Sequence, residues 1–193
     1  MKGSTFARFL PLAFLIFLFP LRLQAQILSG ISDVALSATM TESLSVTLTG
    51  ANSVSFTLTP GGVAAGNTGV PIETSWVLKP NRTAVTLVGY FDIPANALTN
   101  AGPPLTYLTS SLVLGQVTGT GPGRTTTFTA FNQTITGIGP AGGSLQLFSE
   151  PIGGSNKVNT RDDTLALEID LSSVPQQAAG DYTGILHIRA IAP

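Results

Sequence analysis

The chain of 193 residues has no cysteine and only one histidine. Without cysteine it can form no disulfide, no thiolate metal site and no cysteine nucleophile. One histidine alone excludes a cluster of histidine metal ligands. Charged residues make up 10% of the chain, far below the usual share of about a quarter. We therefore expect the fold to be stabilised by apolar burial and backbone pairing, with few ionic groups available for catalysis.

The one long apolar run lies at the start of the chain. Lys2 and Arg8 are followed by a mostly apolar stretch, residues 9–21, and then by Leu-Gln-Ala at residues 23–25. A basic start, an apolar middle and a small residue before the cleavage point are typical of a secretory signal peptide. Residues 1–25 therefore predict a secreted protein, located in the periplasm or at the cell surface.

An uncleaved membrane anchor is the alternative reading of this run. The run is shorter than the roughly 20 apolar residues that a spanning helix needs, and Pro11 and Pro20 interrupt it. We therefore favour cleavage, with residues 26–193 forming one domain that has no membrane partner.

Cleavage would also change the charge of the chain. Three of the 9 basic side chains (Lys2, Arg8 and Arg22) lie in the signal, and all 10 acidic ones follow it, so the exported part carries a net charge of −4. Nucleic-acid binding needs a basic patch, and none is present. We predict no nucleic-acid partner.

Most of the remaining chain alternates apolar residues with Ser and Thr, which is typical of strands with one buried face. The pattern predicts strands at residues 34–40 and 44–48 and a return strand at 54–58. Residues 72–78 and 84–91, joined by the turn Lys79-Pro80-Asn81-Arg82, predict a hairpin. Further strands are expected at residues 105–117, 125–135, 145–148, 165–171 and 182–190. The fold class we predict is all-β: an immunoglobulin-like antiparallel β-sandwich of about eight to ten strands.

The last two predicted strands carry a resemblance. The segment "PQQAAGDYTGILHIRAIA" resembles the C-terminal strand pair of bacterial surface β-sandwiches of the spore coat protein U-like and fimbrial subunit type. The matching positions are Ala179, Gly180, Tyr182 and Leu186, about a seventh of the chain. The resemblance implies an immunoglobulin-like structural subunit of the cell exterior. Some of those families carry disulfides, which this chain cannot form.

Two groups of residues are candidates for a catalytic site. His187 lacks a nucleophile signature such as G-x-S-x-G elsewhere in the sequence, so we interpret it as an ordinary strand residue. Glu168 and Asp170 point the same way from one strand, at a spacing of roughly 6.6 Å. Paired carboxylates can hydrolyse glycosides, but these two are expected to face solvent without an aromatic cleft. We predict no catalytic residue and no enzyme.

Three further features of the sequence bear on binding and on local structure. Residues 159–163 could offer oxygen ligands to calcium, but Arg161 lies among them and a polar turn is favoured. Trp76 shares its parity with Ile72 and Leu78, which favours a core position over a carbohydrate platform. Tyr182 is expected to fix a corner through its hydroxyl group. We predict no metal site, no cofactor site and no cofactor.

The function we favour from the sequence is structural or adhesive. Strands faced with Ser and Thr leave the sheet edges poorly guarded by charge, so assembly through strand pairing is expected, with other copies or other surface subunits as partners. Residues 26–33 are the predicted donor strand. The alternative is a carbohydrate- or ligand-binding module of the envelope, and a secreted hydrolase ranks third.

Overall fold

The computed structural model describes Ser32 and residues 34–193. The predicted signal peptide and most of the predicted donor strand, residues 26–33, lie outside the described residues. The chain divides into two units, Met1–Ala38 and Thr39–Pro193. In the first unit, residues 34–38 are exposed and belong to no helix or strand. Among the described residues, no helix is long and apolar enough to cross a membrane.

The second unit is built from β-strands, with two 3-10 helices of three residues each. The strands are β1 (Ser43–Leu48), β2 (Val63–Ala65), β3 (Val70–Val77), β4 (Ala84–Tyr90), β5 (Leu98–Asn100), β6 (Thr106–Leu108), β7 (Val113–Gly119), β8 (Thr129–Ala130), β9 (Ser144–Pro151), β10 (Val158–Asp170) and β11 (His187–Ile191). The 3-10 helices are η1 (Pro94–Asn96) and η2 (Ser110–Leu112). The prediction of an all-β fold is confirmed.

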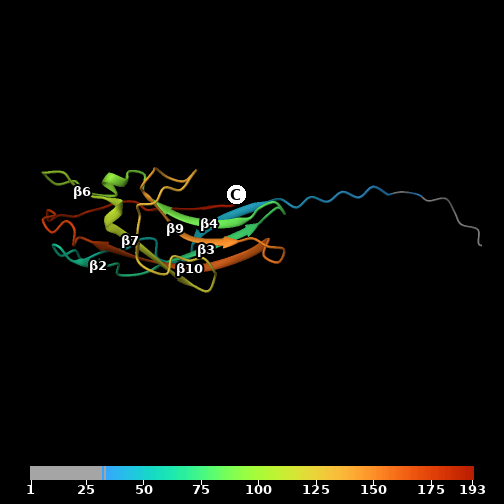
Figure 1. Cartoon of the computed structure of the whole chain (residues 1–193), viewed down its shortest axis with the longest axis horizontal. Coiled ribbons are helices and arrows are strands. Elements are labelled where there is room, and N and C mark those ends of the chain that lie inside the picture. The colour runs from blue at the N-terminus through green and yellow to red at the C-terminus, as the bar shows by residue number, and fades with distance from the viewer. Residues whose placement is uncertain (1–31, 33) are drawn as a thin grey trace, which may run out of the picture. The chain divides into compact units, whose positions relative to one another are not determined.

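Two antiparallel sheets pack face to face. Sheet A has the order β1-β3-β10-β7-β8, with β2 pairing to β10 beyond the end of β3, and sheet B has the order β11-β4-β9. Figure 1 shows β4 and β9 in one layer and β3 and β10 in the other. The separate pair β5-β6 lies with the 3-10 helices at one end of the strands.

The core lies between the two sheets, and alternation within the strands explains it. In β10, Leu165, Leu167 and Ile169 are buried while the residues between them are half-buried. In β3, Ile72 and Trp76 are buried in the same alternating way, so the core position predicted for Trp76 is confirmed. A strand with this pattern buries one face and leaves the other to solvent.

The predicted hairpin of residues 72–78 and 84–91 is wrong. Its two strands exist as β3 and β4, but β3 pairs with β1 and β10 in sheet A, whereas β4 pairs with β9 and β11 in sheet B. The turn between them carries the chain from one sheet to the other. Alternation identifies a buried face, and it does not distinguish a neighbour in the same sheet from one in the facing sheet.

Several predicted strands are shorter than expected or absent. Residues 34–40 and 54–58 form no strand. Residues 105–117 are divided between β6 and β7 by η2, and residues 125–135 contain only β8. The last strand, β11, begins at His187 and not at Tyr182. At residues 34–40, 54–58 and 182–186, a strand-like pattern is therefore present without a paired strand.

Candidate functional site

A groove runs along one edge of the sandwich, between two segments of the described chain. Its volume is about 780 Å³. One wall is residues 52–58, which follow β1, and the other is residues 180–186, which precede β11. The first wall continues the edge of sheet A and the second continues the edge of sheet B, so the groove lies where the two sheets are not joined.

The first wall is extended but scarcely bonded to its own sheet. Ser55 donates its backbone N–H to Asn67 Oδ1 at 2.9 Å and accepts from Asn67 N at 3.0 Å. Among the described residues, the other backbone groups of residues 53–58 make no backbone hydrogen bond. Backbone groups of this kind are normally paired in a folded protein, so this wall offers a free strand edge.

The second wall has the same character. Thr183 exchanges two backbone hydrogen bonds with Thr99 of β5, at 2.8 and 3.0 Å. In the described part of the chain, the remaining backbone groups of residues 181–186 have no backbone partner. Two strand-like segments therefore face the same hollow with unpaired edges.

The floor of the groove is the sandwich core itself. Side chains that are otherwise buried between the sheets line it, among them Phe91, Val113 and Ile169. Val54, Phe56 and Leu58 add an apolar stripe from the first wall, and they pack against the core while staying half-buried. The groove is thus an opening into the core, and its lining favours apolar side chains at alternate positions of an extended chain.

Charge is nearly absent from the groove. Asp181 is the one charged residue among those that line it. A lining that mixes apolar side chains with uncharged polar groups gives little Coulombic attraction for a charged small molecule. It favours a neutral occupant that can bury side chains and pair its backbone. Residues 34–41 have this composition, since none of them is charged. Val34, Leu36 and Met40 of that segment are 80%, 91% and 78% exposed.

The opposite edge is closed by a strap, residues 120–125, between β7 of sheet A and β9 of sheet B. Gly123 O accepts a hydrogen bond from Ser149 N at 3.0 Å, and Thr125 N donates to Leu147 O at 2.9 Å, both in β9. Val117 N of β7 donates to Thr125 O at 2.7 Å. The strap therefore pairs with both sheets and bridges them at this edge.

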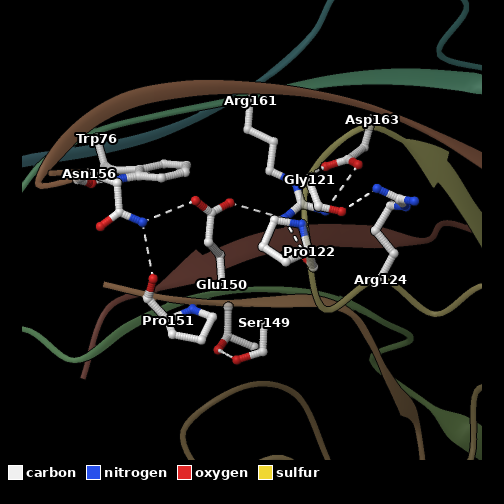
Figure 2. A network of polar contacts seen from close by, with 11 residues as sticks. Trp76, Gly121, Pro122, Arg124, Ser149, Glu150, Pro151, Asn156, Arg161 and Asp163 are labelled. Atoms are coloured by element: carbon white, nitrogen blue, oxygen red, sulfur yellow. Dashed lines mark hydrogen bonds and ion pairs between the residues drawn. The ribbon is translucent and has the colours of Figure 1, made fainter. Parts of the chain in front are cut away.

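A buried ionic group fixes this strap. The guanidinium of Arg161 donates to both oxygens of Asp163, at 2.6 and 3.1 Å, and to Glu150 Oε2 at 3.1 Å. It also donates to Pro122 O of the strap at 2.7 Å and lies 3.8 Å from the ring centroid of Phe148. Figure 2 shows the guanidinium between the two carboxylates. Both carboxylates accept hydrogen bonds from the one guanidinium, which offsets the cost of burying the group.

The network continues from Glu150 to the core tryptophan. Asn156 Nδ2 donates to Glu150 Oε1 at 3.2 Å and to Pro151 O at 3.0 Å. Trp76 Nε1 donates to Asn156 O at 2.8 Å, and Figure 2 follows these contacts from one side of the cluster to the other. The prediction of a polar turn at residues 159–163 is therefore wrong: these residues lie in β10, and Arg161 and Asp163 belong to the core network.

The sequence could not reveal this network, because its members come from β3, β9, β10, the turn between β9 and β10, and the strap. The one available signal is whether a residue occupies an odd or an even position along the strand. Arg161 and Asp163 share the parity of Leu165 and Leu167, so a strand beginning at Val158 instead of residue 165 would have directed both side chains inward.

The residues weighed as acids and bases do not converge on one place. His187 begins β11, where its Nε2 lies 3.1 Å from Asp92 Oδ2 and its ring stacks on Tyr90 at a centroid distance of 5.2 Å. Glu168 and Asp170 lie on β10, on the face opposite the core side chains. The hydroxyl and backbone N–H of Ser172 both donate to Asp170 and lower the pKa of its carboxyl group.

Tyr182 lies where a corner residue was expected. Its hydroxyl group donates to Ala178 O at 2.8 Å, lies 2.9 Å from Thr106 Oγ1 and accepts from Gln177 Nε2 at 2.6 Å. The predicted corner contact is confirmed, and it holds residues 178–182 against β6. The groove wall that follows is thereby fixed at one end.

Metal ligands are not gathered anywhere in the described part of the chain: no group of three or more His, Cys, Asp or Glu side chains there could hold an ion. Comparison of the chain with family models, with curated proteins and with solved structures gives no match.

Proposed function

We propose that this chain is an exported structural or adhesive subunit of a bacterial surface, and that its immunoglobulin-like sandwich is completed by a β-strand from another copy. The single observation that carries this proposal is the groove, where two unpaired, strand-like walls face each other across the open core. A strand inserted there would pair with both walls and bury alternate side chains on the floor. This is the physical basis of β-strand addition.

The segment before β1 fits the groove as a donor. Residues 34–40 have the alternating pattern of a strand, and the side chains of Val34, Leu36 and Met40 are exposed. Exposing several large apolar side chains on one parity is unfavourable in water, and the groove would bury them. Residues 26–33, the donor predicted from the sequence, directly precede this segment and would extend it.

Connectivity favours insertion into a neighbouring copy. The donor segment joins β1 at Ser43, which pairs with Val77, whereas Leu48, at the other end of β1, lines the groove. Five residues of strand separate these ends by about 17 Å. A donor would have to reverse completely to enter the groove of its own chain, but a second copy placed end to end needs no reversal. Repeating that contact generates an open chain of subunits.

The alternative function, a carbohydrate-binding module, has less support. The single tryptophan is 2% exposed and donates its N–H to Asn156, so it offers no face for sugar stacking. The proposal also assigns the chain no enzymatic activity, because the groove contains one carboxylate and no nucleophile with a neighbouring base.

The test uses residues 26–193 in light scattering over a concentration series. We expect oligomers that grow with concentration and that disappear when residues 26–41 are deleted. A synthetic peptide of residues 34–41 added to the deleted chain should stabilise it, by about 2.7 kcal/mol at a hundredfold excess over Kd. The matched control is the same peptide with Val34, Leu36 and Met40 replaced by Ser, which should have no effect. A monomer at every concentration, together with an inactive peptide, would contradict the proposal.

A further inference from the structure

The charged residues are distributed unequally between the two ends of the strands. Lys79, Arg82 and Lys157 lie at the end where β3 stops and β10 begins, and we call this the basic end. Glu42 also lies there and is paired with Arg82. Outside the buried Arg161 group, three cations against one anion leave this end positive.

Three carboxylates lie toward the other end of the strands. Glu168 and Asp170 close β10, and Asp181 lies on the groove wall before β11. We call these three residues the acidic end. Arg189, the remaining exposed cation of the described chain, lies in the middle of β11, opposite Val88. Arg161 is buried, and Arg124 is half-buried on the strap.

The proposed donor segment brings these two ends together. Glu42 is fixed to the basic end, because Arg82 Nε and Nη2 donate to its carboxylate at 2.8 and 3.1 Å and Lys79 N donates at 3.2 Å. Only Thr41 separates Glu42 from Met40, the last apolar residue of the donor. Two residues span about 7 Å, which is within the screening length of about 8 Å at physiological ionic strength.

We infer that the basic end of one copy docks against the acidic end of the next, and that this charge complementarity sets the head-to-tail direction of the assembly. The inference rests on the proposed function, because it requires the donor strand to occupy a neighbour's groove. Contacts between two acidic or two basic ends would bring like charges together, so the wrong orientation is disfavoured. Opposite ends attract over a short range and speed up encounter.

Lys79 and Asp181 are the residues best suited to a test. Both are exposed, Lys79 lies beside the fixed Glu42, and Asp181 lines the groove. We therefore choose K79E, D181K and the double variant K79E/D181K, all in residues 26–193. R189E is the matched control, because it changes the net charge as K79E does at a site away from both ends.

Assembly is measured by light scattering at about 20 mM and about 500 mM NaCl, where screening lengths differ severalfold. At low salt, we expect each single variant to need about fivefold more protein to assemble, since reversing one exposed pair is worth roughly 1 kcal/mol. The double variant should return to within about twofold of the wild type. At high salt the three variants should match the wild type, and R189E should match it in both buffers.

Two results would overturn the inference while leaving the proposed function intact: wild-type assembly of K79E and D181K at low salt, or a double variant as weak as the two singles combined. A wild-type chain that stays monomeric in both buffers would overturn both. Thermal melting of each variant as a monomer, with residues 26–41 deleted, separates a docking defect from a folding defect.

Discussion

The two long edges of this sandwich are built in opposite ways. At one edge the strap, residues 120–125, pairs with β7 and β9, and the buried Arg161 group fixes it to the core. At the other edge residues 52–58 and 180–186 diverge around an apolar groove of about 780 Å³. At the closed edge the backbone of the strap pairs with both sheets, and each buried carboxylate accepts a hydrogen bond from Arg161. The other edge leaves its backbone pairing groups free.

This difference separates stability from assembly. Burying an ionic group is tolerated only when its members are paired. Substituting a single member at the closed edge should therefore destabilise the fold. An unpaired edge over an open core costs free energy in the isolated chain, and a partner strand would recover it. We therefore expect variants of the closed edge to affect unfolding, and variants of the open edge to affect association.

The largest effect is expected at the closed edge, for Arg161→Met. The substitution leaves Asp163 and Glu150 with side chains only 1% and 8% exposed and without their cation. Removing one partner of a buried ion pair costs about 3–5 kcal/mol, and we expect this loss in the free energy of unfolding measured with urea. Arg189→Met, on an exposed position, should change it by less than about 0.5 kcal/mol.

A triple variant separates charge from packing at this edge. When Asp163→Leu and Glu150→Leu are added to Arg161→Met, no buried charge is left, and such replacements are often neutral or stabilising. We expect most of the lost stability to return. If the triple variant is as unstable as Arg161→Met alone, the hydrogen bond to Pro122 of the strap, and not charge pairing, holds the edge closed.

A substitution at the open edge should weaken association and leave the stability of the fold unchanged. Ile185 lines the groove and is 72% exposed, so Ile185→Arg should leave the free energy of unfolding of the chain without residues 26–41 within about 0.5 kcal/mol. Binding of the peptide of residues 34–41 should weaken about tenfold, because a charge would border an apolar site. Calorimetric titration measures this change in affinity.

Val158→Arg is the matched control, because Val158 is apolar, 63% exposed and outside the groove. Equal binding by both variants would place the peptide elsewhere.

Much of the fold could be predicted from alternation alone. The strands at residues 44–48, 72–78, 84–91 and 165–171 exist, and Trp76 lies in the core as its parity indicated. The pairing of those strands could not be predicted. The period of two identifies which face is buried, and the two sheets of a sandwich bury their faces against the same core. The turn sequence at residues 79–82 therefore predicted a hairpin, whereas in the structure this turn connects sheet A to sheet B.

The groove escaped prediction for a related reason. Residues 34–40 and 54–58 have strand patterns as regular as that of β3, and nothing local shows that they lack a partner within the chain. Only the register of the neighbours shows this: β4 ends at Tyr90, opposite His187, so the chain before His187 extends beyond its sheet. A strand pattern without a partner in either sheet therefore marks a segment that is free to pair with another strand.

A smaller effect is expected for Tyr182→Phe, which tests how firmly the groove wall is fixed. The substitution removes the hydroxyl group that contacts Ala178, Thr106 and Gln177 and keeps the half-buried ring. We expect a loss of about 1 kcal/mol in the free energy of unfolding, together with faster amide exchange at residues 180–186. Unchanged stability and exchange would mean that the bridge between Thr183 and Thr99 is sufficient to hold the wall. Tyr107→Phe is the control, because that hydroxyl has no hydrogen bond to the described part of the chain.

The smallest effect concerns the ion pair at the base of the donor segment. Hydrogen bonds from Arg82 and from the backbone N–H of Lys79 lower the pKa of Glu42 from 4.5 to about 2. Because the pKa is lower in the folded state, the pair stabilises the fold fully above pH 4.5, and this contribution is lost as the pH falls from 4.5 toward 2. Glu42→Gln should remove that part of the pH dependence, so the difference in stability between the two chains should shrink on acidification. Titration of Glu42 by NMR measures the pKa directly. A value near 4.5 would mean that the donor segment leaves the sandwich from an unfixed point, and the charged ends of neighbouring copies would then lose their fixed spacing.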